Sequence, residues 1–216
     1  MNVVSYSVWG ELDSLYVRGA IKNALLVHKF YPGWIPRFYV PNGIDMKIRD
    51  ALRDAGGQCV VVCDSDKVDP WFGLYWRFGP MFDDPDVERF IVRDTDSRIS
   101  PREVDAVAEW VESGIPFHIM RDNPCHNVPI LGGMWGAVPG CVPGFKENMA
   151  KWVQSVSGNN SNPRGRLHGT DQDFLKMHVW PYIKHSHIAH GIPFEGNVRP
   201  FRVENPDGYR VGIFSV

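Results

Sequence analysis

The sequence lacks the cysteine pairs, charge runs and long apolar stretches that mark several classes of protein. Its 216 residues include four cysteines, none in Cys-x-x-Cys spacing, which argues against a structural zinc site or a disulfide framework. A formal net charge of −2 and the absence of basic runs argue against a positively charged surface that would bind nucleic acid. No apolar run approaches the length of a membrane span, and we expect no targeting leader. We therefore expect a cytoplasmic protein with free thiols.

The composition, 44% hydrophobic and 22% charged, is typical of one globular domain. Strand-like and helix-like segments alternate in the first part of the chain, which predicts an α/β structure with helices packed on a largely parallel sheet. Strands are expected at 2–8, 37–40, 58–63 and 88–93, and helices at 12–30, 44–55 and 101–113, with partial helix at 71–82. Ser100 is expected to cap the helix that Pro101 opens and Gly114 ends.

The second half has a more mixed pattern. Strands are expected at 117–120, 130–138 and 188–190, and helices at 145–156 and 171–179, the last capped by Thr170. Residues 157–163, rich in serine, glycine and asparagine, predict a loop.

The most informative local feature is the pair Asp94 and Asp96, which flank Thr95 directly after an apolar strand. Side chains alternate between the faces of a strand, so the two carboxylates are expected to point the same way and to reach one hard cation. Such a cation can hold a diphosphate and polarise a phosphorylated leaving group. Asp-x-Asp is also common by chance, and the alternative is a solvated turn.

Four segments of the sequence are informative together: Arg93–Arg98 (RDTDSR), Phe117–Asp122 (FHIMRD), Leu131–Gly136 (LGGMWG) and Asp171–Leu175 (DQDFL). In this order they resemble the nucleotide-sugar glycosyltransferases of GT-A fold. The similarity covers nearly the whole chain and is closest to the small glycosyltransferase domains encoded by chlorella viruses and their bacterial relatives. It implies an α/β, Rossmann-like GT-A fold with a mixed, mostly parallel sheet. One domain over 1–216 is expected, with a nucleotide-binding half at about 1–100 and a donor-sugar and acceptor half at about 101–216.

The resemblance also implies a metal site for Mn²⁺ or Mg²⁺. Asp94 and Asp96 match the metal-binding pair of the family, with Asp96 in direct contact with the ion. A histidine followed by glycine near the C-terminus matches the third ligand, which points to His190. His185 and His187 are rivals, because this His-x-His run would place two rings on one face of a strand.

For the nucleotide, the resemblance implies contacts from Ser5, Tyr6 and Ser7 at the end of the first strand, and from Thr95 between the aspartates. Tyr6 is expected to stack on uracil, or alternatively to be a core aromatic. Arg77, within an aromatic segment, is expected to contact the phosphates or the base. The alternative for Arg77 is an ion pair with one of Asp83, Asp84 and Asp86. Arg93 and Arg98, which flank the aspartates, are expected to neutralise them or, alternatively, to contact hydroxyls of the donor.

For the sugar, glycine within an apolar strand marks a close approach to the backbone, which is expected at Gly132 and Gly133. A bulge packed under a helix is the alternative there. Trp135 is expected to pack on the sugar. Asp122 is preferred over Arg121 and His126 as the hydrogen-bonding partner of the sugar and is also expected to be catalytic. Asp171 and Gln172 match the Asp-Gln-Asp segment of retaining enzymes and are expected to be catalytic, although acidic residues at a helix start are also ordinary capping.

The expected reaction moves a hexose from a UDP-sugar, UDP-glucose or a relative such as UDP-rhamnose, to a glycan or glycoprotein hydroxyl. The viral resemblance places it in capsid-glycan synthesis in a host cytoplasm, and the chain is either complete or one domain of a larger polypeptide. A carbohydrate-binding module would explain the eight tryptophans and seven tyrosines without the aspartates. A phosphohydrolase would need a downstream lysine, for which Lys176 is a poor candidate. A nucleotidyltransferase would need a glycine-rich loop after the first strand, which Ser7-Val8-Trp9-Gly10 does not supply.

Overall fold

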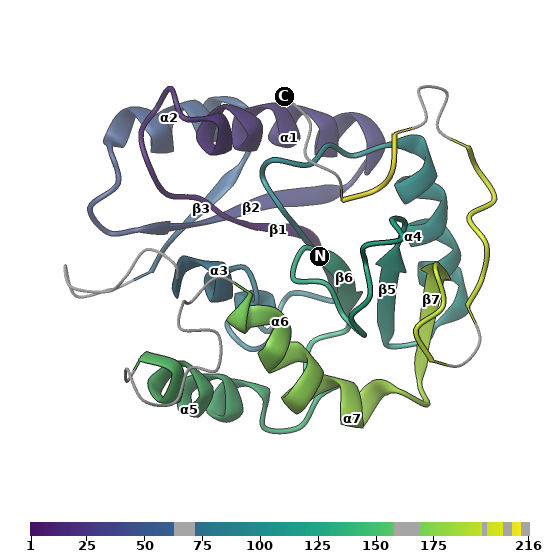
Figure 1. Ribbon diagram of the computed structural model, residues 1–216. Helices are drawn as coiled ribbons and strands as arrows, with labels where there is room; N and C mark the ends of the chain where they lie inside the picture. Colours follow the sequence, from purple (N-terminus) through teal and green to yellow (C-terminus); the bar gives the residue numbers. More distant parts are fainter. Residues whose placement is uncertain (63–71, 158–168, 196–197, 205–208, 213–216) are drawn as a thin grey trace.

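The computed structural model describes residues 1–62, 72–157, 169–195, 198–204 and 209–212 (Figure 1). Within them, a seven-stranded sheet has the order β3-β2-β1-β4-β6-β5-β7. The strands are β1 Asn2–Ser7, β2 Trp34–Pro41, β3 Gln58–Val62, β4 Arg89–Arg93, β5 Phe117–Arg121, β6 Met134–Ala137 and β7 His187–Gly191. β6 runs antiparallel to its neighbours β4 and β5, and every other neighbouring pair is parallel.

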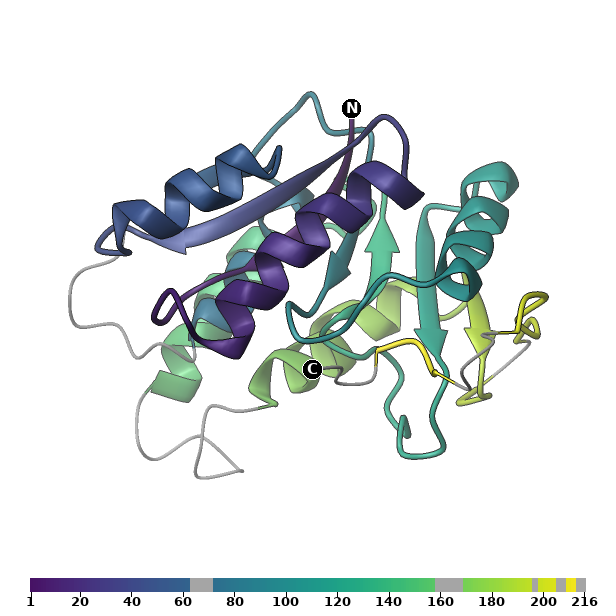
Figure 2. The same cartoon turned by 90° about the horizontal axis from the view of Figure 1, so that it is seen from above.

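Helices cover both faces of the sheet (Figures 1 and 2). One face packs against α1 Leu15–Phe30, α2 Met46–Asp54 and α4 Pro101–Ser113; the other packs against α3 Gly73–Trp76, α5 Phe145–Ser157, α6 Thr170–Phe174 and α7 Trp180–Ile183. The predicted α/β class, with a mixed and mostly parallel sheet flanked by helices, is confirmed. No helix in the described part of the chain is long and apolar enough to cross a membrane.

Alternation along β1 divides its side chains between the two cores. Val4 and Tyr6 are buried with α1, α2 and α4, whereas Val3 belongs to the opposite core. Ser5 and Ser7 are therefore directed to the α3 side, where both bond to the backbone of Arg77. This division decides which residues of β1 can reach a site on the α3 side.

Helix ends agree with the local signals. The hydroxyl of Ser100 accepts a hydrogen bond from the Glu103 N–H at 3.4 Å, and Gly114 ends α4 with a φ of 70°. Both predictions for this helix are confirmed. The Asp171 helix differs, because Gly169, with a φ of 85°, occupies the N-cap position. The Thr170 hydroxyl instead accepts a hydrogen bond from Tyr75 Oη at 2.9 Å.

The two largest shifts of an expected boundary are at the end of the α6 segment and at the start of β6. α6 continues through a π-helical turn, η3 Leu175–Val179, into α7, so this helical segment is longer than predicted. β6 begins at Met134 rather than at residue 130, because a turn precedes it, with the Met134 N–H bonded to Leu131 O at 3.3 Å. The loop predicted at 157–163 lies, apart from Ser157, outside the described residues, as does Cys63.

The carboxyl ends of β1, β4 and β5 meet the start of β6 at one edge of the sheet. The strand order changes direction between β1 and β4, which is the position where open α/β sheets bind ligands. Segments that follow Ser7, Arg93 and Arg121, and the segment that precedes Met134, are thereby brought together.

Candidate active site

A cavity of about 610 Å³ opens at this edge of the sheet, within the size range of small-molecule and cofactor sites. Residues proposed from the sequence that line it are Ser7, Arg77, Asp94, Thr95, Asp96, Gly132, Gly133, Asp171 and Gln172. Five other proposed residues, all in described segments, lie outside the lining: Ser5, Tyr6, Asp122, Trp135 and His190. The tertiary structure therefore gathers most, but not all, of the expected set.

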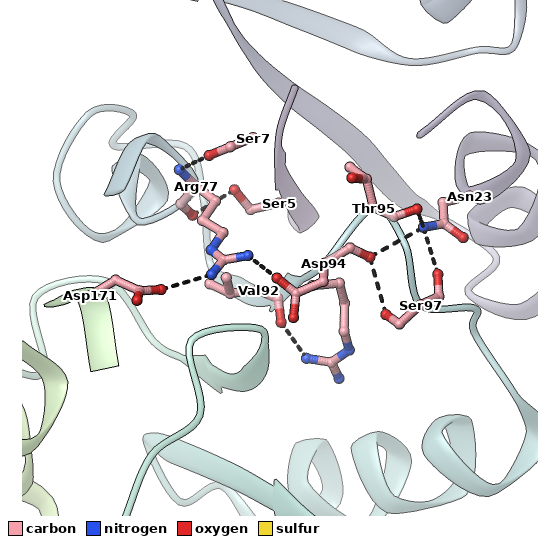
Figure 3. Close-up of polar contacts among 10 residues, drawn as sticks. Ser5, Ser7, Asn23, Arg77, Val92, Asp94, Thr95, Ser97 and Asp171 are labelled. Carbon is pink, nitrogen blue, oxygen red and sulfur yellow. Dashed lines mark hydrogen bonds and ion pairs between the residues drawn. The ribbon is translucent and has the colours of Figure 1, made fainter. Parts of the chain in front are cut away.

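Arg77 lines this cavity. Its guanidinium lies between the carboxylates of Asp94 and Asp171 (Figure 3). Its Nη2 donates to Asp171 Oδ2 at 2.9 Å, and its Nη1 donates to Asp94 Oδ1. Burial by itself lowers the pKa of Arg77, but Asp94 and Asp171 outweigh that effect and raise it, so the guanidinium is firmly cationic. Asp83 and Asp84, considered as alternative partners, lie beside Arg37 instead.

The two serines of β1 hold the backbone of Arg77. Ser5 Oγ donates to Arg77 O at 2.7 Å, and Ser7 Oγ accepts from Arg77 N at 2.9 Å. Ser5 is fully buried, which corrects its expected contact with a nucleotide. Its role is to position Arg77, whereas Ser7 both positions Arg77 and lines the cavity.

Asp94 and Asp96 reach the cavity from a turn. β4 ends at Arg93, and Ser97 Oγ donates back to Asp94 O at 3.1 Å. Asn23 of α1 donates to Ser97 O at 3.0 Å, which fixes the turn against the helix. Strand alternation was therefore the wrong reason for bringing the two carboxylates together, although both line the cavity.

The flanking arginines do not neutralise the pair directly. Arg93 turns to the α4 side and donates from Nε to Glu103 at 2.6 Å. Arg98 donates from Nη1 to the carbonyl of Thr95 at 2.8 Å and so closes the turn. Both side chains are structural supports of the Asp94–Asp96 segment.

The cavity concentrates negative charge. Burial and then the negative charge of Asp94 raise the pKa of Asp96. Burial likewise raises the pKa of Asp171, with Arg77 opposing the change and Asp94 reinforcing it. A cation bound beside Asp94 and Asp96 would stabilise their ionised forms.

The residues present fit a divalent cation in part. Carboxylate oxygens are suited to Mg²⁺ and Mn²⁺, and Mg²⁺ usually takes one or two carboxylates and completes its shell with substrate phosphates and water. Asp94 and Asp96 supply such a pair. Within the described segments no group of three or more His, Cys, Asp or Glu side chains could hold a metal, so the protein alone offers an incomplete shell.

His190 is separated from these carboxylates, which corrects its assignment as a third ligand. Its Nδ1 lies 2.9 Å from His118 Nε2, and its Nε2 lies 3.4 Å from Glu109 of α4. The ring is therefore held on the α4 side of the sheet, whereas the cavity opens on the α3 and α6 side. Of the two rivals, His185 is exposed and His187 bonds to Ile183 O at 3.0 Å.

Asp122 is also a structural residue. Arg102 donates to both of its carboxylate oxygens at 3.0 Å, and the Val211 N–H donates to Oδ2 at 2.8 Å. The side chain thereby fastens the C-terminal segment to α4, and its expected catalytic role is corrected. His126, from the same loop, lines the cavity instead.

Gly132 and Gly133 leave the space that the carboxylates of Asp171 and Asp94 occupy. A Cβ atom at Gly132 would collide with Asp171 Oδ2 and would lie 2.8 Å from Arg77 Nη2, and one at Gly133 would collide with Asp94. The sequence predicted a close approach to this backbone and named a sugar as the cause. In the structure the side chains of Asp171 and Asp94 make that approach.

Two aromatic expectations are corrected. Tyr6 is fully buried on the α1 side and stacks on Phe38 with 5.2 Å between ring centroids. Trp135 is fully buried and stacks on Phe117 with 5.3 Å between ring centroids. The aromatic residues that line the cavity are Trp9, which contacts Trp76 edge-on at 6.1 Å, and Tyr16, which is 53% exposed. The position of Trp9 just after the first strand was the signal available in the sequence.

No protein-family model matches the sequence, and no curated protein sequence matches it. Similar solved structures include a mycobacterial protein, with 14% identity, a TM-score of 0.42 and coverage of 65% of this chain and 54% of that one. A 4-diphosphocytidyl-2C-methyl-D-erythritol synthase from Anaerococcus prevotii is 10% identical, with a TM-score of 0.46 and coverage of 91% of both chains. A mannosyltransferase from Pyrobaculum calidifontis, in complex with GDP-Man and Mn²⁺, is 10% identical with a TM-score of 0.46. Its alignment covers 90% of this chain and 58% of the mannosyltransferase. At this level of similarity none of the three assigns an activity, and the chain spans little more than half the length of two of them.

Proposed function

We propose that this protein is a metal-dependent glycosyltransferase that moves a hexose from a UDP-sugar to a glycan hydroxyl with retention of configuration. The single observation that carries the proposal is the convergence of Asp94, Asp96 and Asp171 on one cavity around Arg77. Asp94 and Asp96 belong to one, and Asp171 to another, of the four segments that resemble GT-A enzymes. Arg77 comes from a part of the chain outside these segments. The donor, UDP-glucose or a relative such as UDP-rhamnose, and the setting of capsid-glycan synthesis rest on the sequence resemblance.

The nucleotide is assigned to the β1 and β4 side of the cavity. Trp9 and Tyr16 offer aromatic surface for the base, in place of the buried Tyr6. Stacking suits this role because every base has a flat π-face. Thr95, between the aspartates, also lines this part of the cavity.

The diphosphate is assigned to the region between Arg77 and the aspartates. Arg77 is held cationic and presents a planar set of donors, which suits the negative charge of a departing diphosphate. A divalent cation held by Asp94 and Asp96 would act as a Lewis acid on that leaving group. The protein's own contribution is the fixed orientation of Arg77 through Ser5 and Ser7.

The sugar is assigned to the part of the cavity lined by Gly132, Gly133, Asp171 and Gln172. The bond from the anomeric carbon to the diphosphate oxygen breaks, and an acceptor hydroxyl forms the new bond on the same face. Its proton passes to the departing phosphate oxygen. The Asp171 carboxylate stabilises positive charge at the anomeric carbon, and no covalent intermediate is needed.

The phosphohydrolase alternative is less well supported. It needs Asp94 as a nucleophile and a lysine beside it, but Asp94 is paired with Arg77 and Lys176 is exposed outside the cavity lining. The carbohydrate-binding module remains the competing non-enzymatic function. It predicts sugar binding without dependence on nucleotide or metal.

The test is calorimetric titration of UDP, GDP and UDP-glucose, each with Mn²⁺ and again with excess chelator. We expect UDP and UDP-glucose to bind only with the metal, and Asp96→Ala to abolish this binding while the protein stays folded. Asp50→Ala, which removes an exposed carboxylate of α2, is the matched control and should bind as the wild type does. Equal UDP affinity in Asp96→Ala and wild type, or no nucleotide binding by the wild type, would overturn the proposal.

A further inference from the structure

His126 lies in the loop between β5 and β6 and lines the same cavity as the aspartates. Its Nδ1 is 3.2 Å from the backbone nitrogen of Asp122 and 3.2 Å from that of Asn123. A backbone hydrogen bond also closes the loop: the backbone N–H of His126 donates to the backbone carbonyl oxygen of Asn123 at 2.7 Å. The orientation of the ring is therefore fixed by the backbone of its own loop.

These contacts also decide where the proton of the ring lies. A nitrogen that accepts two N–H groups must present a lone pair, so the proton of the neutral imidazole is on Nε2. Burial lowers the pKa of His126; Asp122 opposes this effect, and Arg121 and Arg210 add to it. His126 is thus a neutral ring whose remaining polar atom, Nε2, is a hydrogen-bond donor and not a base.

The strand order places this donor away from the proposed nucleotide. Along the edge, β1 and β4 carry Trp9 and the Asp94–Asp96 turn, β6 follows, and the loop of His126 extends from β5 beyond it. The wall next to His126 in the chain is Leu131–Met134, which includes the glycines packed against Asp171 and Asp94. An oxygen that meets Nε2–H in this part of the cavity belongs to the sugar rather than to the base.

We infer that His126 is a specificity residue for the hexosyl group, donating from Nε2 to a sugar hydroxyl oxygen. The inference rests on the proposed function and adds a contact that the sequence had assigned to Asp122. Asp122 cannot make that contact because both of its oxygens are held by Arg102. A site built to donate to a hydroxyl discriminates against sugars that lack this hydroxyl or carry it in the other configuration.

Two substitutions separate the roles of the two ring nitrogens. His126→Asn keeps an acceptor near the position of Nδ1 but leaves no N–H at the position of Nε2, whereas His126→Gln restores an N–H near that position. The binding probes are UDP, UDP-glucose, UDP-galactose and GDP-mannose with Mn²⁺, and the readout is the affinity for the nucleotide sugar relative to that for its parent nucleotide. His185→Asn, at an exposed histidine, is the matched control.

We expect His126→Asn to bind UDP and to unfold as the wild type does, but to lose about 2- to 10-fold in relative affinity for the preferred nucleotide sugar, the range of one neutral hydrogen bond. His126→Gln should recover part of this loss. An unchanged ratio in His126→Asn overturns the inference and assigns His126 to the acceptor or to the loop alone. The inference is also overturned if the wild type binds each nucleotide sugar no more tightly than it binds the parent nucleotide.

Nitrogen-15 NMR of the histidine rings tests the same inference without any ligand. We expect the Nδ1 of His126 to resonate as an unprotonated nitrogen and Nε2 as a protonated one, and the reverse assignment overturns the inference. The two failures are distinguishable. Absence of nucleotide binding with the expected tautomer refutes the proposed function, whereas nucleotide binding with the opposite tautomer refutes only the role of His126.

Discussion

The Nη2 atom of Arg77 lies 2.9 Å from Oδ2 of Asp171, although 94 residues separate the two in the chain. Both side chains are nearly inaccessible, with exposed fractions of 5% and 4%. The ion pair joins the segment after α3 to the first turn of α6 and so fixes one wall of the cavity. A buried pair of this kind is destabilising when it is broken, because the remaining charge is left without compensation.

Arg77→Met is expected to lower the free energy of unfolding by about 3–5 kcal/mol, the range for breaking a buried ion pair. Asp171→Asn combined with Arg77→Met should lose less than the sum of the single changes, since the stranded carboxylate is then absent. Urea unfolding of the four proteins in this cycle measures the coupling. Arg53→Met is the control, because the pair Arg53–Asp50 is exposed and should contribute at most about 1 kcal/mol. Additive effects of Arg77→Met and Asp171→Asn would contradict the prediction.

Gly133→Ala is expected to displace the Asp94 carboxylate, because the new Cβ atom collides with it. Overpacking of this kind lowers the free energy of unfolding by about 1–3 kcal/mol. The larger effect should be on metal-dependent UDP binding, since Asp94 is part of the proposed metal pair. Gly43→Ala is the matched control, because a Cβ there meets no atom within 4 Å. Wild-type UDP affinity in Gly133→Ala would show that the position of Asp94 is not critical.

Trp9→Ala and Tyr6→Phe distinguish the two candidate aromatic surfaces. Loss of stacking on one base is worth about 1–3 kcal/mol, so Trp9→Ala should weaken UDP binding by roughly 5- to 150-fold. Tyr6→Phe should leave UDP affinity unchanged, because Tyr6 is buried on the opposite face. Its hydroxyl has no hydrogen-bond partner among the described residues, so its removal should be neutral or slightly stabilising. Calorimetry and urea unfolding measure both effects, and a stronger effect of Tyr6→Phe on UDP affinity would reverse the assignment.

His118 should make stability depend on pH. Its ring is fully buried, and burial, then the neighbouring His190, hold its pKa well below the ordinary value of 6.5. The unfolded chain therefore binds a proton below about pH 6.5 that the folded protein excludes. Stability is fully present above that pH and should fall on acidification, by up to about 1.4 kcal/mol per pH unit for one proton. Urea unfolding at about pH 7.5 and about pH 5.5, on either side of the histidine pKa, should show the loss. His118→Asn should reduce the pH dependence and His185→Asn should not; an unchanged slope in His118→Asn would place its origin elsewhere.

Local signals predicted most of the fold because their physical causes are local. Ser100, Pro101 and Gly114 bounded α4 correctly, since caps act within one turn of the chain. The expected strands overlap β1 to β5 and β7, because a buried strand is a short apolar run. β2 differs most among them, since it spans Trp34–Pro41 and not only 37–40. The start of β6 was placed too early because glycines and apolar residues at 130–133 read as strand but form a turn.

The candidate site was predicted in its charged residues and less well in its supporting ones. Asp94, Asp96, Asp171 and Arg77 were named from the sequence and meet in one cavity. Tyr6 was misassigned because alternation separates neighbours on a strand without saying which face carries the site. The sequence contained no signal that His190 turns toward Glu109.

By itself, the sequence determined the alternation of strands and helices, the aspartate pair at a strand end and the glycines that need space beside them. These features follow from side-chain periodicity, capping and steric limits that act over a few residues. Only the tertiary structure decided that Arg77 pairs with Asp94 and Asp171, that Trp9 rather than Tyr6 faces the cavity, and that His126 rather than Asp122 does so. Those outcomes depend on strand order and on contacts between residues far apart in the chain. The partner of a charged or aromatic side chain there is determined by which residues the fold brings close in space, and its neighbours in sequence do not determine it.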